Sequence, residues 1–452
     1  MTVARELAEF LTGIVPADLP AQTIDHAAML VASTLASAAM GSGLQSARII
    51  RDLARERGGT AQASIWFDSG AKLPVVDAAQ VNAVISDGAA SDDSDLRTIV
   101  HCGTPLTATS LAIAERDGCS GEEVLGAIVL GYELAGRIVD AVPNARGRGF
   151  HGSTAAIFAA AGAAGRLLHL DADRMTNAIA LAATSASGLA KAADTSIARE
   201  YHAGMATGNG IQAARAAQRG YTAEARILEM PQGFFEALGG SQVAAAAERA
   251  TAGLGRGWDI VSDMAVKLVP GGHPYHALAE AAANAAKEGE ISADEVEEIT
   301  VSRPGMASLT GPAHPRDLID MAHSPSYFLA AGAADREFTW AHAGAAKIAD
   351  PVIHRLIDKV RVGPPPTENA ALYRQGATVT IRASNGRSAT STVYAPKGAG
   401  CLGIAWADID AKFRALMPLS GISASAIEVS LALIHDFPRL PKAGALTEAL
   451  RG

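Results

Sequence analysis

The sequence predicts a mainly α-helical protein, with a large all-helical domain formed by both ends of the chain and a smaller inserted α+β domain. Apolar and small residues recur at helical spacing as far as Lys267, and Gly or Pro interrupts them. Beyond Lys267, short stretches rich in alternating β-branched residues replace this pattern, and the segment from Trp406 onward returns to it. We therefore expect a helical domain of residues 1–266 and 401–452 and an α+β domain of residues 267–400.

Three segments show the helical pattern most clearly. They are "AQTIDHAAMLVASTLASAAMG" (residues 21–41), "GEEVLGAIVLGYELAGRIVDAV" (121–142) and "TGNGIQAARAAQRG" (207–220). Aromatic residues make up only 5% of the chain, so the core must consist largely of Ala, Leu, Ile and Val. We expect many closely packed helices.

Three strands are expected in the inserted domain. They are "EEITVSR" (297–303), "KVRVG" (359–363) and "ATVTIRAS" (377–384). Asn385-Gly386 and "RSATSTVYAP" follow the last strand, which predicts a β-hairpin whose two central turn residues both have positive φ. Val379 and Ile381 should face a core, while the residues that alternate with them should face water. The latter are Thr378, Thr380 and Arg382.

The composition excludes several classes of protein. With a formal net charge of -9 and no basic cluster, the chain lacks a surface that would follow a nucleic-acid backbone. The small or apolar run from Ala155 to Gly165 covers 11 residues, whereas a membrane span needs roughly 20. Cys102, Cys119 and Cys401 form no C-x-x-C pair, which argues against a structural zinc or iron–sulfur site. We expect a cytoplasmic protein that binds neither nucleic acid nor membrane.

The first segment with candidate site residues is "SDDSDLRTIVHCGTP", in which Asp92, Asp93 and Asp95 precede His101. Carboxylates beside a histidine can hold its tautomer or bind a metal ion. The alternative is a solvated acidic loop that leads into a helix capped by Thr104. The residue types leave both interpretations open.

The second segment is "RGRGFHGSTAAIFAAAGAAG" (146–165), where a helix of small residues begins. Ser153 or Thr154 can cap this helix, and the free backbone N–H groups at its start favour an anion. Arg148 and His151 would add positive charge or a proton. The alternative is a glycine-rich loop between helices with a pair of surface arginines.

Three further segments place a basic residue or a tyrosine near a helix of small residues. Arg199 and His202 in "DTSIAREYHAGMATGNG" are three residues apart and can share a helix face. Lys267 and His276 occur in "AVKLVPGGHPYHALAEAAA", and Tyr327 occurs in "MAHSPSYFLAAGAA". These residues can bind carboxylates or transfer protons. The alternatives are a structural histidine, a lysine whose ammonium reaches water, and a tyrosine that anchors its helix by packing.

No G-x-S-x-G, P-loop, Rossmann or H-E-x-x-H motif occurs in the chain. Taken together, the five segments indicate a cationic, histidine-rich site without a metal or cofactor, suited to a small polycarboxylate.

The same segments resemble the MmgE/PrpD family, which includes 2-methylcitrate dehydratases, cis-aconitate decarboxylases and iminodisuccinate epimerase. The resemblance covers nearly the whole chain. It is carried by "VLGYELAGRI", "RGFHGSTAAIFAAAGAAGRLL", "GYTAEARILEMPQGFFEALGG", "AVKLVPGGHPYHALAEA" and "PKGAGCLGIAWADIDAKFRALMP". It implies a helical domain made from both chain ends, an inserted α+β lid domain and a homodimer.

The resemblance also assigns individual residues. His101 falls on the family histidine that follows the acidic motif, and His151 falls on the histidine of the R-G-F-H motif. Lys267 and His276 match the first lysine and the later histidine of the interdomain motif, and Tyr327 matches the tyrosine after "AHSPS". The resemblance implies that these residues form one pocket.

The chain departs from the family pattern at several positions. The leading Asp of the acidic motif falls on Ala90 and its His on Asp95, and Cys102 stands where the family has Pro. Arg199 replaces the lysine of the K-x-[LF]-H motif, while His202 remains. An arginine can bind a carboxylate bidentately, but it cannot donate a proton near neutral pH. These departures leave a different substrate open.

The resemblance implies a cofactor-independent lyase that removes a proton next to a carboxylate of a small hydroxy di- or tricarboxylate. The residues expected to take part in catalysis are His101, His151, Lys267 and Tyr327. The residues expected to bind substrate are Asp92, Asp93, Arg148, Arg199, His202 and His276. No metal is expected. Two alternatives stay open: an epimerase or isomerase of an imino- or amino-dicarboxylate such as iminodisuccinate, and a non-catalytic relative that binds carboxylates.

Overall fold

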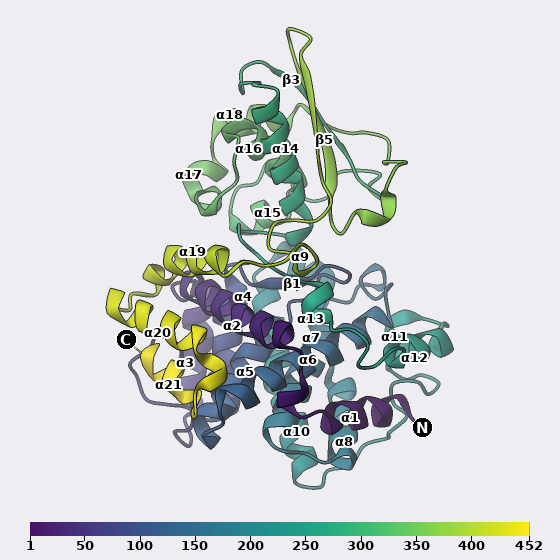
Figure 1. Ribbon diagram of the computed structural model, residues 1–452, viewed down its shortest axis with the longest axis vertical. Helices are drawn as coiled ribbons and strands as arrows, with labels where there is room; N and C mark the ends of the chain where they lie inside the picture. The colour runs from purple at the N-terminus through teal and green to yellow at the C-terminus, as the bar shows by residue number, and fades with distance from the viewer. Residues whose placement is uncertain (452) are drawn as a thin grey trace. The chain divides into compact units, whose positions relative to one another are not determined.

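The computed structural model describes residues 1–451, and the chain divides into two compact units. Unit 1 comprises Met1–Val266 and Ile404–Gly452, and unit 2 comprises Lys267–Gly403. The predicted fold class is confirmed, because most elements are helices and the larger sheet lies in unit 2 (Figure 1).

Unit 1 is built around a helix of small residues. Its helices are α1 (Val3–Gly13), α2 (Ala21–Gly41), α3 (Gln45–Arg57), α4 (Val75–Gly88), α5 (Gly103–Asp117), α6 (Gly121–Asp140), α7 (Ser153–Leu167), α8 (Ala172–Ser185), α9 (Ala190–Thr195), α10 (Ala198–Gln218), α11 (Phe234–Gly239), α12 (Val243–Thr251), α13 (Asp259–Ser262), α19 (Trp406–Leu416), α20 (Ala424–His435) and α21 (Gly444–Ala449). Helix α7 is buried along nearly its whole length and packs against α5, α6 and α10. The approach of α10 is close, since a Cβ on Gly210 would lie 2.6 Å from the carbonyl oxygen of Ile157. The predicted close packing of small-residue helices is confirmed.

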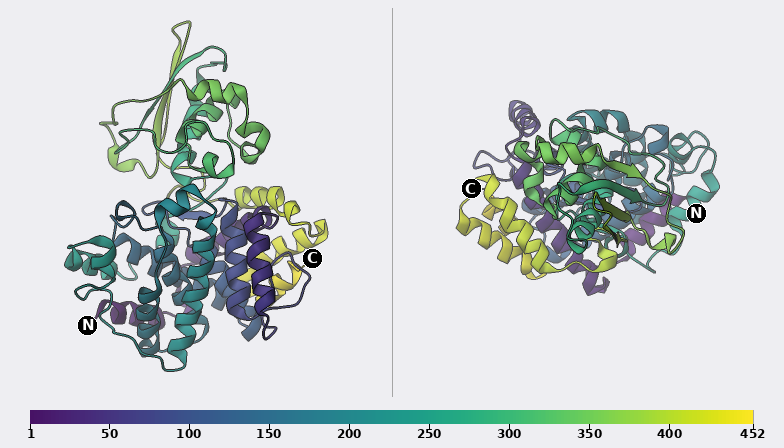
Figure 2. Two further views of the ribbon diagram at one scale, coloured as in Figure 1. Left: turned by 180° about the vertical axis from the view of Figure 1, so that it is seen from behind. Right: turned by 90° about the horizontal axis from the view of Figure 1, so that it is seen from above.

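The C-terminal segment returns to unit 1 and packs against its N-terminal helices. Figures 1 and 2 show α19 beside α2, although almost four hundred residues separate them in the sequence. Lys412 of α19 is 2% exposed, and its ammonium donates hydrogen bonds to the Ser33 hydroxyl (2.7 Å) and to the carbonyl oxygen of Ser91. A buried ammonium is stable only when its donors are satisfied, so this contact ties the last part of unit 1 to the segment that leads into Asp92.

A short antiparallel pair of strands in unit 1 was not predicted from the sequence. Strand β1 (Asp93–Asp95) pairs with β2 (Met264–Val266), with Asp93 opposite Val266. Both strands are fully buried. The acidic segment therefore runs through the interior of unit 1.

Unit 2 has a four-stranded sheet with helices on one face (Figure 2). Its strands are β3 (Val296–Ser302), β4 (Val360–Val362), β5 (Ala377–Ala383) and β6 (Ser388–Val393), and its helices are α14 (His276–Glu288), α15 (Leu318–Ala322), α16 (Pro325–Asp335), α17 (Ala345–Ile348) and α18 (Pro351–Ile357). The strand order is β4-β3-β5-β6, with β3 and β4 parallel and the other pairs antiparallel. Helix α14 packs on β5 and β6, and α16 packs on α14. The three predicted strands are confirmed to within one or two residues.

The predicted hairpin is confirmed, but its expected turn is wrong. Strand β5 pairs with β6 around Asn385-Gly386, and Val379 and Ile381 are buried as expected. Only Gly386 has a positive φ (85°), and the Gly386 N–H donates to the carbonyl oxygen of Ala383 at 3.0 Å. The loop therefore has three residues with glycine in the left-handed position, a common hairpin type that needs positive φ at one residue only.

Within residues 1–451 no single helix is both long and apolar enough to cross a membrane. The pair α2 and α3 passes that test only when the two are taken together, and the chain bends by 95° between them.

Candidate active site

The acidic segment is buried, so the interpretation as a solvated loop is wrong. The side chains of Asp92 and Asp93 are 0% exposed. The Asp93 carboxylate accepts a hydrogen bond from the N–H of Gly103 (2.8 Å), the first residue of α5, and Asp92 accepts one from the Thr104 hydroxyl (3.3 Å). Thr104 is therefore not the predicted cap. Asp93 satisfies the free N–H group at the start of α5, where negative charge is favoured.

His101 is held by the backbone of β1. Its Nδ1 lies 2.6 Å from the carbonyl oxygen of Asp93 and 3.4 Å from the Asp92 carboxylate. A carbonyl oxygen can only accept, so Nδ1 carries a proton. The acidic segment thus orients His101, as one of the two sequence interpretations proposed.

His151 takes the place of the predicted hydroxyl cap of α7. The helix begins at Ser153, and the residue in the N-cap position, Gly152, has no side chain that could cap it. The Ser153 N–H instead donates to His151 Nδ1 at 3.3 Å. The Thr154 hydroxyl instead donates to the backbone oxygen of His151 (2.8 Å). Burial, together with the nearby His101, lowers the pKa of His151 to about 2. The imidazole is therefore neutral at physiological pH.

Arg199 is paired inside unit 1. Its guanidinium donates to the Asp87 carboxylate at 3.0 Å and to the backbone oxygens of Asp87 (2.6 Å) and Gly88 (3.1 Å). These oxygens lie at the C-terminal end of α4, where a cation is favoured. Several of the guanidinium donors are thus used within the protein, and Arg199 joins the start of α10 to the end of α4.

His202 lies on α10 beside His151, with a distance of 5.5 Å between the two ring centroids. Burial lowers the pKa of His202. Within residues 1–451 the buried Nδ1 of His202 has no hydrogen-bond partner. His101, His151 and His202 therefore lie in one region of unit 1, since His101 and His202 both contribute to lowering the pKa of His151.

The two arginines before α7 hold loops. Arg148 donates to the backbone oxygen of Ala237 at 3.1 Å, and Arg146 forms an ion pair with Asp194 at 2.7 Å. Both side chains are exposed. This geometry supports the alternative interpretation of the segment as an interhelix loop with surface arginines.

A cluster of buried carboxylates around the exposed Arg97, next to β1, was not predicted from the sequence. Arg97 contacts the carboxylates of Asp95 (3.1 Å), Asp259 and Asp263 (3.3 Å), and the backbone N–H of Asp259 donates to Glu133 (2.9 Å). Burial and the neighbouring Glu133 carboxylate raise the pKa of Asp259 to about 8, against the effect of Arg97. The only local signal was Arg97 two residues after Asp95, because the other partners come from distant parts of the chain.

In unit 2, the side chains of Lys267, His273 and His276 are buried. Lys267 directly follows β2 in the chain and is 1% exposed, which does not fit the interpretation of an ammonium that reaches water. His273 and His276 lie at the start of α14 with ring centroids 4.7 Å apart, and His276 stacks on Phe328 at 5.9 Å.

Tyr327 belongs to the hydrophobic core of unit 2. It is 0% exposed, and its hydroxyl donates to the carbonyl oxygen of His342 at 2.9 Å. Burial raises the pKa of Tyr327 above its usual range. The geometry supports a tyrosine that anchors its helix by packing, and it speaks against the expected part in proton transfer.

Comparison with known proteins covers nearly the whole chain. The model of the MmgE/PrpD N-terminal domain matches residues 5–246, and that of the MmgE/PrpD C-terminal domain matches residues 270–432. The chain belongs to the MmgE/PrpD family. The resemblance seen in the sequence is confirmed.

Several relatives within the MmgE/PrpD family are cis-aconitate decarboxylases. The human enzyme is 22% identical over 464 residues, covering 100% of this chain and 95% of the relative. The mouse enzyme is 23% identical, covering 100% of this chain and 94% of the relative. The Aspergillus terreus enzyme is 27% identical over 270 residues, covering 57% of this chain and 54% of its own length.

The two MmgE/PrpD matches divide the candidate residues. The N-terminal match contains His101, His151 and Arg199, and the C-terminal match contains His276 and Tyr327. The candidate residues of unit 1 meet around β1 and the starts of α7 and α10. That all the candidates of both units form one pocket stays a prediction. Within the described residues no group of three His, Cys, Asp or Glu side chains is arranged to hold a metal ion.

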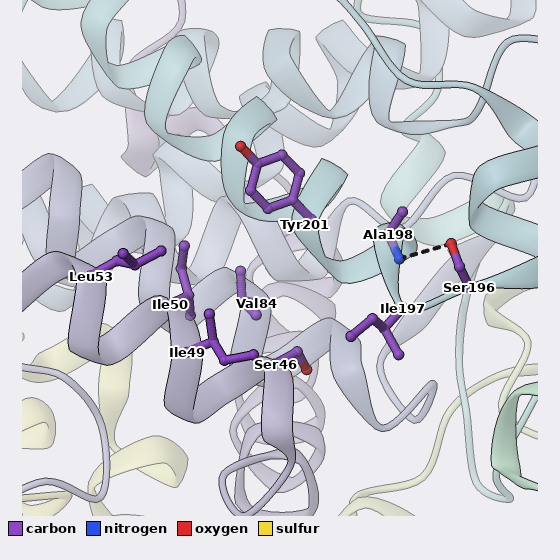
Figure 3. Close-up of a pocket in the computed structure, with 9 residues that line it drawn as sticks. All are labelled: Ser46, Ile49, Ile50, Leu53, Val84, Ser196, Ile197, Ala198 and Tyr201. Atoms are coloured by element: carbon purple, nitrogen blue, oxygen red, sulfur yellow. Dashed lines mark hydrogen bonds between the residues drawn. The ribbon is translucent and has the colours of Figure 1, made fainter.

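Unit 1 of this MmgE/PrpD protein also has an apolar pocket of about 330 Å³ at its surface (Figure 3). Ile49 and Leu53 of α3 line one wall, and Ile197 and Tyr201 line the opposite wall at the start of α10 (Figure 3). These four side chains are 44–54% exposed. The pocket adjoins the helix start that carries Arg199 and His202.

Proposed function

We propose that this chain is a cofactor-independent lyase that acts on a small di- or tricarboxylate by removing a proton next to a carboxylate. The observation that carries the proposal is a pair of imidazoles held by backbone groups: His101 beside the buried Asp92 and Asp93, and His151 at the start of α7. The full-length similarity to cis-aconitate decarboxylases supports a lyase and a tricarboxylate substrate class. No step of this reaction requires a redox cofactor.

The chemistry requires a base and stabilisation of negative charge. Proton removal leaves an enolate-like carbanion, and groups that donate hydrogen bonds or carry positive charge lower its energy. We assign His101 and His151 to these tasks, with Lys267 and His276 as further groups that bind carboxylates. His202 and Arg199 form the adjacent helix start. Because the Arg199 guanidinium is hydrogen-bonded to Asp87, we assign Arg199 to positioning α10. Only its remaining N–H donors would be left to bind a substrate carboxylate.

A substrate panel in D2O tests the proposal. The full-length protein is incubated with cis-aconitate, citrate, 2-methylcitrate and iminodisuccinate, and the products are followed by proton NMR and carbon dioxide release. A lyase that removes the α-proton forms or consumes an alkene. Release of carbon dioxide would instead establish a decarboxylase and overturn the proton-removal step. Deuterium exchange at the α-carbon with no change of skeleton would instead establish an epimerase and overturn the lyase proposal.

The same panel with Lys267→Ala and His101→Gln tests the site. Loss of turnover in both variants, with folding verified by circular dichroism, supports the assignment. Unchanged turnover in both would contradict it. Thermal shifts on the wild-type protein separate binding from catalysis, because a ligand that binds only the native state raises its melting temperature. Stabilisation by carboxylates without turnover would indicate a non-catalytic relative.

We also propose that the protein forms a homodimer and that a second copy covers the apolar pocket of α3 and α10. The family resemblance supports the dimer, and the four exposed apolar side chains support the position of the interface. Ile49→Glu combined with Leu53→Glu should give a monomer in light scattering. Leu419→Glu is the matched control, since Leu419 is also apolar and 60% exposed but lies outside the pocket. A monomeric wild-type protein would overturn the proposal.

A further inference from the structure

We infer that the backbone of unit 1 holds the imidazoles of His101 and His151 as opposite tautomers: His101 has its proton on Nδ1 and, as a neutral ring, its lone pair on Nε2, whereas His151 has its proton on Nε2. The backbone N–H of Ser153 positions His151 in this form. The inference assigns the two imidazoles different tasks, and that assignment rests on the proposed function. The tautomers themselves follow from the hydrogen bonds of unit 1.

The His101 tautomer follows from its contact with β1. A carbonyl oxygen has no proton to donate, so the 2.6 Å contact between Nδ1 and the oxygen of Asp93 requires a proton on Nδ1. The Asp92 carboxylate, 3.4 Å from Nδ1, favours the same proton position. The neutral ring therefore has its lone pair on Nε2.

The His151 tautomer follows from a backbone N–H donor whose direction is fixed by the helix. Ser153 is the first residue of α7, and the N–H groups of a first helical turn have no partner within the helix. The Ser153 N–H is directed at His151 Nδ1 (3.3 Å), so a proton on Nδ1 would set two N–H groups against each other. The Ser153 hydroxyl lies 3.2 Å from Nδ1, but it also has the carbonyl oxygen of Ser187 as an acceptor at 3.1 Å. The fixed backbone donor therefore decides the tautomer.

The loop around His151 makes this geometry rigid. The His151 N–H donates to the carbonyl oxygen of Gly188 at 3.0 Å. Gly188 has a φ of 133°, and a Cβ on it would lie 2.3 Å from the Ser153 hydroxyl oxygen. Only glycine allows this approach. His151, Ser153 and Gly188 thus form a tightly closed loop in which the imidazole edge bearing Nδ1 faces the start of α7.

The same contacts keep His151 neutral. A protonated ring would carry N–H groups on both nitrogens, and the one on Nδ1 would oppose the Ser153 N–H. Burial lowers the pKa of His151 in the same direction. Within residues 1–451 the hydrogen bonds of the His151 ring use Nδ1, so the Nε2 hydrogen remains for a ligand.

The two tautomers suit the two tasks of proton removal next to a carboxylate. The α C–H bond breaks, the proton passes to Nε2 of His101, and the electron pair spreads onto the adjacent carboxylate. Nε2–H of His151 donates a hydrogen bond to a carboxylate oxygen as its negative charge grows, without transferring its proton. A neutral imidazole beside a helix N-terminus is suited to this task, because its hydrogen-bond donor is in place before the charge develops.

Nitrogen NMR on the ligand-free, full-length protein tests the inference. The histidines are labelled with ¹⁵N, two-bond proton–nitrogen spectra are recorded between pH 6 and 8, and His101→Gln and His151→Gln provide the assignments. We expect the Nδ1–H form for His101 when it is neutral and the Nε2–H form for His151 throughout. A His151 with Nδ1 protonated, or a His101 with only Nε2 protonated, would overturn the inference. Because no substrate is present, this outcome is independent of the proposed function.

Two substitutions at one position test the part played by Ser153. Ser153→Pro removes the N–H, and proline is tolerated at the first position of a helix; it should shift His151 toward the Nδ1–H form. Ser153→Ala retains the N–H and should leave the tautomer unchanged. A tautomer change in Ser153→Ala would show that the hydroxyl decides it and would overturn this part of the inference. If Ser153→Pro does not fold, the wild-type spectrum and Ser153→Ala still decide.

The pH profile separates the two tasks. His101→Gln should remove the rise of kcat/KM with pH that a base produces. His151→Gln should retain that rise but lower kcat by about 10²–10³-fold, the usual effect of removing one oxyanion donor. Loss of the rise in His151→Gln instead would make His151 the base and contradict the assignment, even with the tautomers as inferred.

Discussion

The starts of α7 and α16 look alike in sequence and differ in the structure. Each is an apolar helix of mainly small residues with a polar ring near its start, His151 before α7 and Tyr327 in α16. His151 is half-buried, and its Nδ1 caps the helix while Nε2 remains for a ligand. Tyr327 is fully buried, and its hydroxyl donates a hydrogen bond to the carbonyl oxygen of His342.

The difference shows that a polar group near a helix start becomes a functional candidate only if packing leaves one of its atoms unused. The aromatic core of unit 2 surrounds Tyr327, with Phe328 and Phe338 within 6.5 Å of its ring. The neighbours of His151 are another imidazole, a serine and glycines. Small residues leave space where aromatic residues fill it.

The largest expected effect separates the two regions by activity. His101→Gln, in the His151 region, should lower kcat/KM by about 10²–10⁴-fold, the usual contribution of a general base. Tyr327→Phe should leave kcat/KM unchanged, because its hydroxyl already has a partner in the core. Steady-state kinetics on the substrate found in the panel decide this. Equal losses in both variants would restore Tyr327 as a catalytic candidate.

The next effect concerns the buried charges that support the His101 segment. Arg97→Met removes an exposed guanidinium from the buried carboxylates of Asp95, Asp259 and Asp263. The cost should lie above the about 1 kcal/mol of an exposed pair and below the about 3–5 kcal/mol of a fully buried one. Urea unfolding measures the free energy. Arg97→Met with Asp259→Asn should recover part of the loss, since one buried charge is then gone. A loss below about 1 kcal/mol, the range of exposed pairs, would show that the cluster does not support unit 1.

A smaller effect is expected in the core of unit 2. Tyr327→Phe leaves the buried carbonyl of His342 without its donor, which costs about 1–3 kcal/mol. Thermal unfolding measures the change. Tyr221→Phe is the control, because Tyr221 is 65% exposed and its change should lie within error. Equal stabilities of wild type and Tyr327→Phe would show that the hydroxyl is not anchored.

The smallest effect is the pH dependence of stability through His151. Its pKa falls from 6.5 to about 2 on folding, so the unfolded chain binds more protons below pH 6.5. Stability from this group is therefore present above pH 6.5 and is lost as the pH falls, by up to about 1.4 kcal/mol per pH unit. His151→Asn should flatten the slope between pH 6 and pH 4.5 in urea unfolding. The exposed His169, replaced by Asn, is the control; equal slopes in wild type and His151→Asn would contradict the buried neutral state.

Local patterns predicted much of the fold. The alternation in residues 377–384 identified a strand with Val379 and Ile381 in the core, and Asn385-Gly386 identified a hairpin. Helical spacing and small residues identified the packed helices around α7. These features depend on neighbours in the sequence, which is why the pattern was sufficient.

Contacts between distant segments were not predictable. Strand β1 pairs with residues 264–266, about 170 positions away, and this pairing converts an acidic segment from a solvated loop into a buried strand. The predicted helix caps were wrong for a related reason. Thr104 and Ser153 have the residue types of caps. In the structure, however, Asp93 and His151 accept the hydrogen bonds from the free N–H groups at the two helix starts.

By itself, the sequence determined the fold class, the family and the residue types available for chemistry on carboxylates. Only the tertiary structure decided what each residue does: His101 and His151 are held by backbone groups, Arg199 is bonded to Asp87, and Tyr327 lies in the core. Secondary structure and family motifs depend on side-chain order along the chain. The state of an imidazole, a guanidinium or a hydroxyl depends on which donors, acceptors and charges reach it through space.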